Sequence, residues 1–224
     1  MHASVKDVWV TFNEPLEGKL RTPYADIKGL VTIGMGNMYD ATDQHGIPLP
    51  PDDAWALVGR EFMALPFKNA AGALVPKSQV KAAWFALARD LQASRLGWRY
   101  AASLPAVGSM ALDDADVDAI IDAKLAQHDA IISPRFADWE DRPADAQLAV
   151  HSMAWGMGPY FWRKFPKFSA AFSDGDYTRA ALECSIMPEV GTIRLRNQRN
   201  KILFTNASQV AADPNADRSV LIWA

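Results

Sequence analysis

Apolar residues recur with a helical period along most of the chain after residue 50. After Pro76 they follow at steps of four, three and four: Val80, Trp84, Leu87 and Leu91. These steps place side chains on one face of a helix, and proline is favourable at a helix start. The same period predicts further helices over residues 52–65, 113–125, 143–158, 161–172, 176–184 and 196–210.

The first 50 residues follow a different pattern, in which short apolar runs alternate with turn residues. Residues 24–26 and 30–33 resemble strands, and the Lys28-Gly29 pair between them is typical of a tight hairpin turn. Residues 34–37, Gly-Met-Gly-Asn, predict either a third strand weakened by glycine or a bulged turn. This part of the chain is therefore expected to form a small sheet.

A short helix is expected just before this hairpin. Asn13 is a favourable N-cap residue and Pro15 suits a first helical turn, so the helix would begin near Asn13 and carry Glu17. Gly18 then allows the chain to leave the helix. Glu17 would thus lie at the junction between a helix and the hairpin.

Together the predicted elements indicate an α+β fold that is mostly helical. We expect one domain over residues 1–224, with a small β-hairpin lobe over about 1–50 and a helical lobe over about 111–224. Residues 51–110 would form a helical insertion or linker between them. At 224 residues, half of them hydrophobic, the chain can bury a substantial core as one domain or two tightly joined lobes.

Composition and charge narrow the range of functions. The net charge of −3 gives no overall electrostatic reason to expect nucleic acid or an anionic membrane as partner. The single cysteine, Cys184, excludes a disulfide within the chain and is more simply interpreted as a small buried thiol than as a nucleophile. The four histidines are scattered without metal-site spacing, so no metal or cofactor is expected. No segment predicts a signal peptide or a membrane span.

Candidate catalytic chemistry is concentrated in residues 17–37. Glu17, Asp26 and Thr32 place two carboxyl groups and a hydroxyl along a segment that folds back on itself. Glycosidic cleavage needs one carboxyl to protonate the leaving oxygen and a second group to activate water or stabilise positive charge. Desolvation of Glu17 at a helix end would raise its pKa and suit it to be the acid. Asp26 on a solvated hairpin would stay ionised, and Thr32 would hold a water by hydrogen bonding.

The same segment contains a series of short motifs: Glu17-Gly18, Tyr24-Ala25-Asp26, Gly29 and Thr32-Ile33-Gly34-Met35-Gly36. This pattern resembles that of the phage-type lysozymes, the glycoside hydrolase family that includes the T-even phage enzyme. Residues 153–158, Met-Ala-Trp-Gly-Met-Gly, are similar to a later helix of that family, and two segments after residue 175 match more loosely. The resemblance does not extend to residues between about 40 and 110.

This resemblance implies hydrolysis of the β-1,4 bond between N-acetylmuramic acid and N-acetylglucosamine in peptidoglycan. It implies that Glu17 is the general acid and that Asp26 with Thr32 activates water, with inversion at the anomeric carbon. Glu14 is chemically as able as Glu17 but does not match the family spacing. Inversion predicts carboxyl groups roughly 6.5–9.5 Å apart. The family also implies a two-lobed, lysozyme-like fold with the substrate cleft between the lobes.

Some positions depart from the family or permit two interpretations. Trp155 lies where the family has an aromatic residue, and we interpret it equally as a substrate-binding wall or as core packing. The family often has histidine where this chain has Asn37, so no ion pair between lobes is expected there. Gly156 has no side chain where some relatives place a polar, sugar-facing group. The basic stretch over residues 163–201 is either a docking surface for anionic wall polymers or a solvated face.

Other functions and two biological settings stay open at this stage. A lytic transglycosylase would use Glu17 and leave Asp26 and Thr32 idle, and a non-catalytic peptidoglycan-binding protein would keep the fold without turnover. The expected protein is made in the cytoplasm and acts on glycan strands in the periplasm or cell wall. It would arrive there as a phage endolysin released through a holin, or as an antibacterial toxin domain delivered by a secretion apparatus. Residues 40–110 would then serve chain-length adaptation, partner binding or recognition by an immunity protein.

Overall fold

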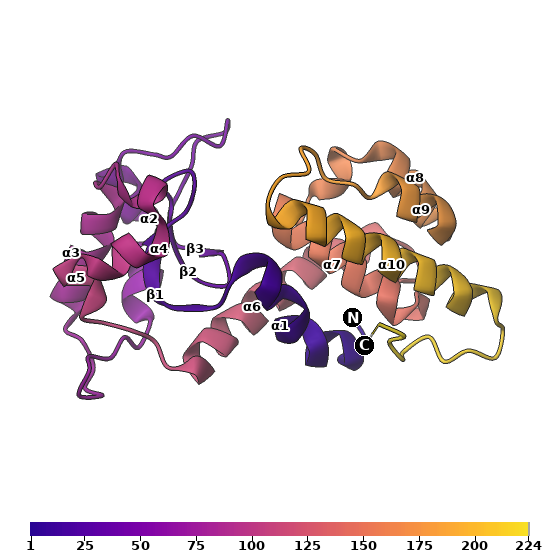
Figure 1. Ribbon diagram of the computed structural model, residues 1–224, viewed down its shortest axis with the longest axis horizontal. Helices are drawn as coiled ribbons and strands as arrows, with labels where there is room; N and C mark the ends of the chain where they lie inside the picture. The colour runs from indigo at the N-terminus through magenta and orange to yellow at the C-terminus, as the bar shows by residue number, and fades with distance from the viewer. Residues whose placement is uncertain (224) are drawn as a thin grey trace. The chain divides into compact units, whose positions relative to one another are not determined.

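The computed structural model describes residues 1–223 and has an α+β fold that is mostly helical, as predicted. The chain divides into two compact units. The sheet unit is Gly18–Ile121, and the helical unit consists of residues 1–17 with the described residues from 122 onward. The second boundary falls inside one helix, α6 (Asp114–Ile132), which therefore contributes residues to both units (Figure 1). These boundaries differ from those expected near residues 50 and 110.

A three-stranded antiparallel sheet contains the predicted hairpin. Its strands, in spatial order, are β1 (Leu20–Ala25), β2 (Val31–Gly34) and β3 (Asn37–Met38). Between β1 and β2 the amide of Asp26 donates to the carbonyl of Leu30 at 3.0 Å. Gly29 closes this turn with a φ of +85°, a conformation that disfavours any residue with a Cβ. The prediction of a tight turn at Lys28-Gly29 is therefore confirmed.

The link from β2 to β3 is a turn rather than a third strand over residues 34–37. Gly34 and Gly36 both have positive φ, and the paired residues of β3 begin only at Asn37. The side chain of Asn37 supports this turn, since its Oδ1 accepts the amide of Met35 at 3.3 Å. Its Nδ2 donates to the carbonyl of Ile120 at 2.9 Å, which attaches the turn to α6 within the sheet unit.

Four helices of the sheet unit come from the segment that we expected to be an insertion or linker. They are α2 (Pro51–Ala64), α3 (Lys77–Ala88), α4 (Ala93–Ser103) and α5 (Pro105–Gly108). Helices α3 and α4 pack against β1 (Figure 1). Trp84 of α3 is fully buried, and its Nε1 donates to the carbonyl of Tyr39 at 2.7 Å. The segment and the sheet thus share one core.

One residue expected on the apolar face of α3 lies outside it. Val80, Trp84 and Leu87 are buried as predicted, but Leu91 is 88% exposed. The reason is that α3 ends at Ala88, so the helical period no longer applies at Leu91.

Helix α7 is the centre of the helical unit. The regular helices of this unit, besides its share of α6, are α1 (Ala3–Glu17), α7 (Ala144–Met157), α8 (Pro166–Ser173), α9 (Tyr177–Glu183) and α10 (Thr192–Ala212). Short 3-10 turns are η1 (Ser133–Arg135), η2 (Trp139–Asp141) and η3 (Phe161–Arg163). Nearly every side chain of α7 is buried, and both α1 and α10 pack against it.

Helix α1 differs from the short helix expected to begin near Asn13. It starts at Ala3 because its apolar residues also recur at steps of four, three and four and are buried: Val5, Trp9, Phe12 and Leu16. Asn13 is fully buried within the helix instead of capping it, and Pro15 lies in the last turn. Glu17 is nevertheless the last residue of the helix, and Gly18, with a φ of +75°, lets the chain leave it.

Candidate functional site

Glu17 is a partly buried carboxyl held by an arginine of a distant helix. Its side chain is 27% exposed, and Nη2 of Arg196 in α10 donates to its Oε1. Burial raises the pKa of Glu17, because a charged carboxylate loses solvation there. The positive charges of Arg196 and Lys124 oppose this effect but do not cancel it. The expectation that burial at a helix end would raise this pKa therefore agrees with the environment found.

Arg196 is itself fixed by a dense set of acceptors. It is 1% exposed, and its Nη1 donates to the backbone carbonyl of Ser152 at 2.7 Å and to Oγ of Ser152 at 3.1 Å. The same nitrogen is 3.4 Å from Oδ1 of Asn13. Gly156 of α7 leaves space for the guanidinium, because a Cβ at that position would be 3.2 Å from Nε of Arg196. The guanidinium of Arg196 therefore occupies the space that a side chain at residue 156 would take.

Lys124 is a second cation that acts on Glu17 within the helical unit, and it lies against Trp155. The ammonium of Lys124 lies 4.2 Å from the ring centroid of Trp155, a cation–π contact, and its charge acts on Glu17. Burial lowers the pKa of Lys124 to about 8. Trp155 is 7% exposed and packs on Trp9 at 5.1 Å and on His128 at 5.6 Å between ring centroids. This packing favours the core interpretation of Trp155 over the sugar-binding one.

The hairpin brings Asp26 and Thr32 together in the sheet unit. Thr32 pairs with Tyr24 across β1 and β2, and Asp26 is hydrogen-bonded to Leu30 two residue pairs further on. Because side chains alternate between the faces of a sheet, Asp26 and Thr32 are diagonal neighbours on one face. The spacing of six residues between them therefore has a direct structural basis.

The hydrogen bonds of these two side chains leave acceptor positions open. Oδ1 of Asp26 accepts the amides of Lys28 at 2.8 Å and Leu30 at 2.9 Å, which orients the carboxylate and leaves Oδ2 for a further donor. Thr32 is buried, and its hydroxyl donates to the carbonyl of Leu30 at 2.9 Å. Since the single hydroxyl proton is used in that bond, the lone pairs of Oγ1 remain to accept from a water.

A third carboxyl, Asp40, lies near this pair and was not recognised in the sequence. Its two oxygens accept the amides of Val31 at 2.9 Å and Ala41 at 2.8 Å. Burial raises the pKa of Asp40, and the negative charge of Asp26 raises it further. The sequence carries no local signal for this proximity, because Asp40 follows β3 and reaches Asp26 only through the pairing of the strands.

Arg196 and Lys124 were also missed as neighbours of Glu17. Arg196 stood out only as part of a loose match and of a basic stretch, and Lys124 did not stand out at all. Both are more than 100 positions from Glu17 in the chain. No spacing rule along one helix or strand relates residues so far apart, so only packing reveals that they lie near Glu17.

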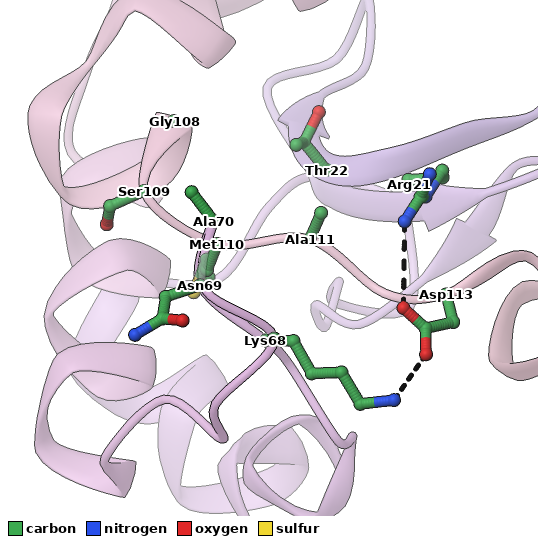
Figure 2. A pocket seen from close by; sticks show the side chains of 11 residues that line it. Arg21, Thr22, Lys68, Asn69, Ala70, Gly108, Ser109, Met110, Ala111 and Asp113 are labelled. Atoms are coloured by element: carbon green, nitrogen blue, oxygen red, sulfur yellow. Dashed lines mark hydrogen bonds and ion pairs between the residues drawn. The ribbon is translucent and has the colours of Figure 1, made fainter.

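A separate cavity of about 500 Å³ lies in the sheet unit, between β1 and the loops around residues 68–72 and 108–113 (Figure 2). Its charged residues pair with one another: Asp113 binds Lys68, and Nη2 of Arg21 is 3.6 Å from Oδ1 of Asp113. None of the site residues expected from the sequence lines this cavity. It therefore adds no group to the candidate site.

The remaining candidate chemistry is limited. Burial raises the pKa of the Cys184 thiol to about 12, which suits a core residue and not a nucleophile. Within residues 1–223, no three side chains of His, Cys, Asp or Glu are grouped so that they could hold a metal ion. No helix in that range is long and apolar enough to cross a membrane. Comparison with models of known protein families and with curated proteins found no match for this chain.

Proposed function

We propose that this protein is a glycoside hydrolase of the muramidase type, which cleaves the β-1,4 bond between N-acetylmuramic acid and N-acetylglucosamine in peptidoglycan. The observation that carries the proposal is the environment of Glu17. Burial raises the pKa of its carboxyl while Arg196 holds the group in one place. A carboxylic acid that keeps its proton nearer neutral pH is what a glycosidase needs to protonate its leaving group.

In the proposed first role, the carboxylic acid of Glu17 donates its proton to the glycosidic oxygen as the bond to the anomeric carbon breaks. The resulting carboxylate then carries a negative charge beside the guanidinium of Arg196. That ion pair stabilises the product state of the proton transfer without preventing protonation beforehand, because burial outweighs the cation in setting the pKa. Arg196 thus acts as a positioning residue for the acid.

In the proposed second role, Asp26 and Thr32 bind the attacking water. One water proton is donated to Oδ2 of Asp26 and the other to Oγ1 of Thr32, the acceptor positions that the hairpin leaves open. The water oxygen attacks the anomeric carbon while Asp26 takes up the first proton, which gives inversion of configuration. Release of that proton to solvent restores the carboxylate of Asp26, and uptake of a proton from solvent restores the acid form of Glu17.

The decisive variant is Glu17→Gln, which keeps the shape of the side chain but removes the acid. We expect release of reducing sugar from purified sacculi to fall to background, while circular dichroism stays unchanged. Glu14→Gln is the matched control, because Glu14 is an exposed glutamate one turn earlier in α1, and it should retain full activity. Full activity of Glu17→Gln would reject Glu17 as the acid.

A second variant tests the water-binding role. Asp26→Asn retains an oxygen that can accept the amides of Lys28 and Leu30 but loses the carboxylate charge. We expect at least a hundredfold loss of hydrolysis with the hairpin intact, since general base catalysis contributes about 10²–10⁴ in rate. Mass spectrometry of the wild-type products distinguishes hydrolysis from transglycosylation. Hydrolysis adds a water to each cleaved bond, whereas a transglycosylase leaves anhydromuramic ends without adding water. Binding to sacculi with no product of either kind would indicate a non-catalytic wall-binding protein.

The proposed reaction fits a protein that lyses bacterial cell walls. The corresponding settings are a phage endolysin that passes the membrane through a holin, and an antibacterial toxin domain carried by a secretion apparatus. In both, peptidoglycan strands are the substrate, and residues 40–110 would offer surface to a delivery or immunity protein. Co-purification from the producing cell, with and without the genes beside the reading frame, tests these partners.

A further inference from the structure

Helix α4 is interrupted by a turn that exposes two apolar side chains between two arginines. The backbone of Gly97 has a φ of 74° and a ψ of −170°, which breaks the helix at the centre of residues 95–99, Arg-Leu-Gly-Trp-Arg. Leu96 is 57% exposed and Trp98 is 46% exposed. Arg95 and Arg99 are exposed as well. We call this segment the 95–99 turn.

The exposure of the 95–99 turn is built into the fold. Ala93 and Ala101, one on each side of the turn, are fully buried. Helix α4 also packs against β1 and α5. A Cβ at Gly97 would meet no other atom within 4 Å, so the glycine is required by its positive φ and not by crowding. The turn is therefore a projection anchored at both ends.

The charged residues of the 95–99 turn itself are both arginines. The chain has no acidic residue between Asp90 and Asp113. Asp90, which precedes this stretch, is negatively charged, and its carboxylate accepts the hydroxyl of Tyr100 at 2.8 Å. The guanidinium carbon of Arg99 lies 5.3 Å from the ring centroid of Trp98. Two cations thus flank the exposed leucine and tryptophan, although the whole chain has a net charge of −3.

We propose that the 95–99 turn binds the surface of an anionic phospholipid membrane. Leu96 and Trp98 enter the boundary between headgroups and acyl chains, where tryptophan is enriched in membrane proteins. Arg95 and Arg99 contact the lipid phosphates from the same turn. Such peripheral binding goes beyond the proposed muramidase activity and does not depend on it. In a wall-cleaving protein it would keep the enzyme close to the membrane that the peptidoglycan surrounds.

The size of the exposed apolar surface favours a membrane over a protein partner. Leu96 and Trp98 together expose roughly 200 Å² of side chain, judged from the area that such residues bury. A stable protein interface needs about 800 Å² on each partner with close shape complementarity. A fluid lipid surface needs no complementary shape, and each arginine near it strengthens binding about fivefold. A small basic and apolar projection therefore matches lipid chemistry better.

Vesicle flotation with the full chain tests the proposal. We expect binding to vesicles of phosphatidylcholine with one quarter phosphatidylglycerol, weak binding to pure phosphatidylcholine, and loss of binding as salt screens the arginines. Leu96→Ser with Trp98→Ser should weaken binding at least tenfold. Arg95→Gln with Arg99→Gln should weaken it about 25-fold, from two fivefold factors. Neither double variant should alter digestion of purified sacculi, so the outcome is separable from that of the Glu17 experiment.

Matched controls distinguish this turn from general surface effects. Leu57→Ser removes an apolar residue of α2 that is 66% exposed, and Lys164→Gln with Lys167→Gln removes two exposed cations of the helical unit. Both should bind vesicles like the wild type. The proposal is overturned if the wild type does not bind anionic vesicles. It is also overturned if the lysine variant loses as much binding as the arginine variant, or if the changes at Leu96 and Trp98 have no effect on binding. Binding to lipid-free sacculi that depends on Trp98 would assign the turn to a wall polymer instead.

Discussion

Nη2 of Arg196 donates a hydrogen bond to Oε1 of Glu17, which joins the end of α1 to α10 across 179 positions of the chain. Arg196 is 1% exposed and Glu17 is 27% exposed, so this ion pair is largely removed from water. Desolvation raises the pKa of Glu17 and the guanidinium lowers it, with desolvation the larger effect. The balance makes both the stability of the protein and its proposed acid chemistry sensitive to the neighbours of this pair.

Glu17→Gln is expected to raise the melting temperature at neutral pH. Because the pKa of Glu17 is higher in the folded state than its ordinary value of 4.5, the ionised carboxyl destabilises the fold. The advantage of the variant should therefore be absent below about pH 4 and grow as the pH rises through the folded pKa. Calorimetry of both proteins between pH 3.5 and 8 measures it, and a lower melting temperature of the variant at pH 7 would contradict the sign.

Gly156→Ala is expected to destabilise the protein by about 1–3 kcal/mol, the usual cost of overpacking a core. The added Cβ would lie 3.2 Å from Nε and 3.4 Å from Cδ of Arg196, so the Arg196 side chain must shift by a few tenths of an ångström. Its hydrogen bonds to Ser152 oppose that shift. Helix propensity alone would change stability in the opposite direction, since alanine is favoured over glycine by about 1 kcal/mol. Urea unfolding therefore separates the two effects by sign. Ser152→Ala, which removes one acceptor of Arg196 without adding volume, is the comparison variant.

Lys124→Met is expected to move the alkaline limb of the activity profile to higher pH. The positive charge of Lys124 lowers the pKa of Glu17, so its removal lets the proposed acid keep its proton longer. Methionine keeps much of the apolar part of the lysine side chain, which packs over the ring of Trp155. Sacculus digestion from pH 5 to 9 gives the profile, with Lys6→Met as a control for an exposed lysine of α1. An unmoved limb would exclude Lys124 from tuning Glu17.

His128→Phe is expected to reduce acid sensitivity. Burial lowers the pKa of His128 to about 3. Between pH 6.5 and 3 the unfolded chain therefore binds a proton at this residue that the folded chain does not bind. Stability is then lost as the pH falls from 6.5 towards 3, at up to about 1.4 kcal/mol per pH unit. The variant should gain roughly 2–3 kcal/mol over the wild type at pH 4.5, by the same slope. Urea unfolding at pH 7 and 4.5 tests this, with exposed His45→Gln as a control that should show no such gain.

The hairpin illustrates how far local sequence patterns can predict this fold. Lys28-Gly29 predicted the turn because its φ requirement is a property of one residue and its neighbours. The helical period likewise placed α7 and α9 close to the predicted ranges 143–158 and 176–184. The prediction was wrong for the start of α1, since Asn13 and Pro15 carry the signals of a helix start but occur inside a longer helix. Burial of the apolar face of α1 outweighed those local preferences.

The candidate site also has a part that follows from local sequence and a part that depends on tertiary packing. Asp26 and Thr32 are neighbours because a two-residue alternation and one turn relate them, and both are readable from residues 24–32. The partners of Glu17 come from α6 and α10, and Asp40 reaches Asp26 through strand pairing. Desolvation and charge act through space and not along the chain, so the raised pKa of Glu17 follows from packing. Local patterns thus selected the candidate groups, and long-range packing decides their electrostatic environment.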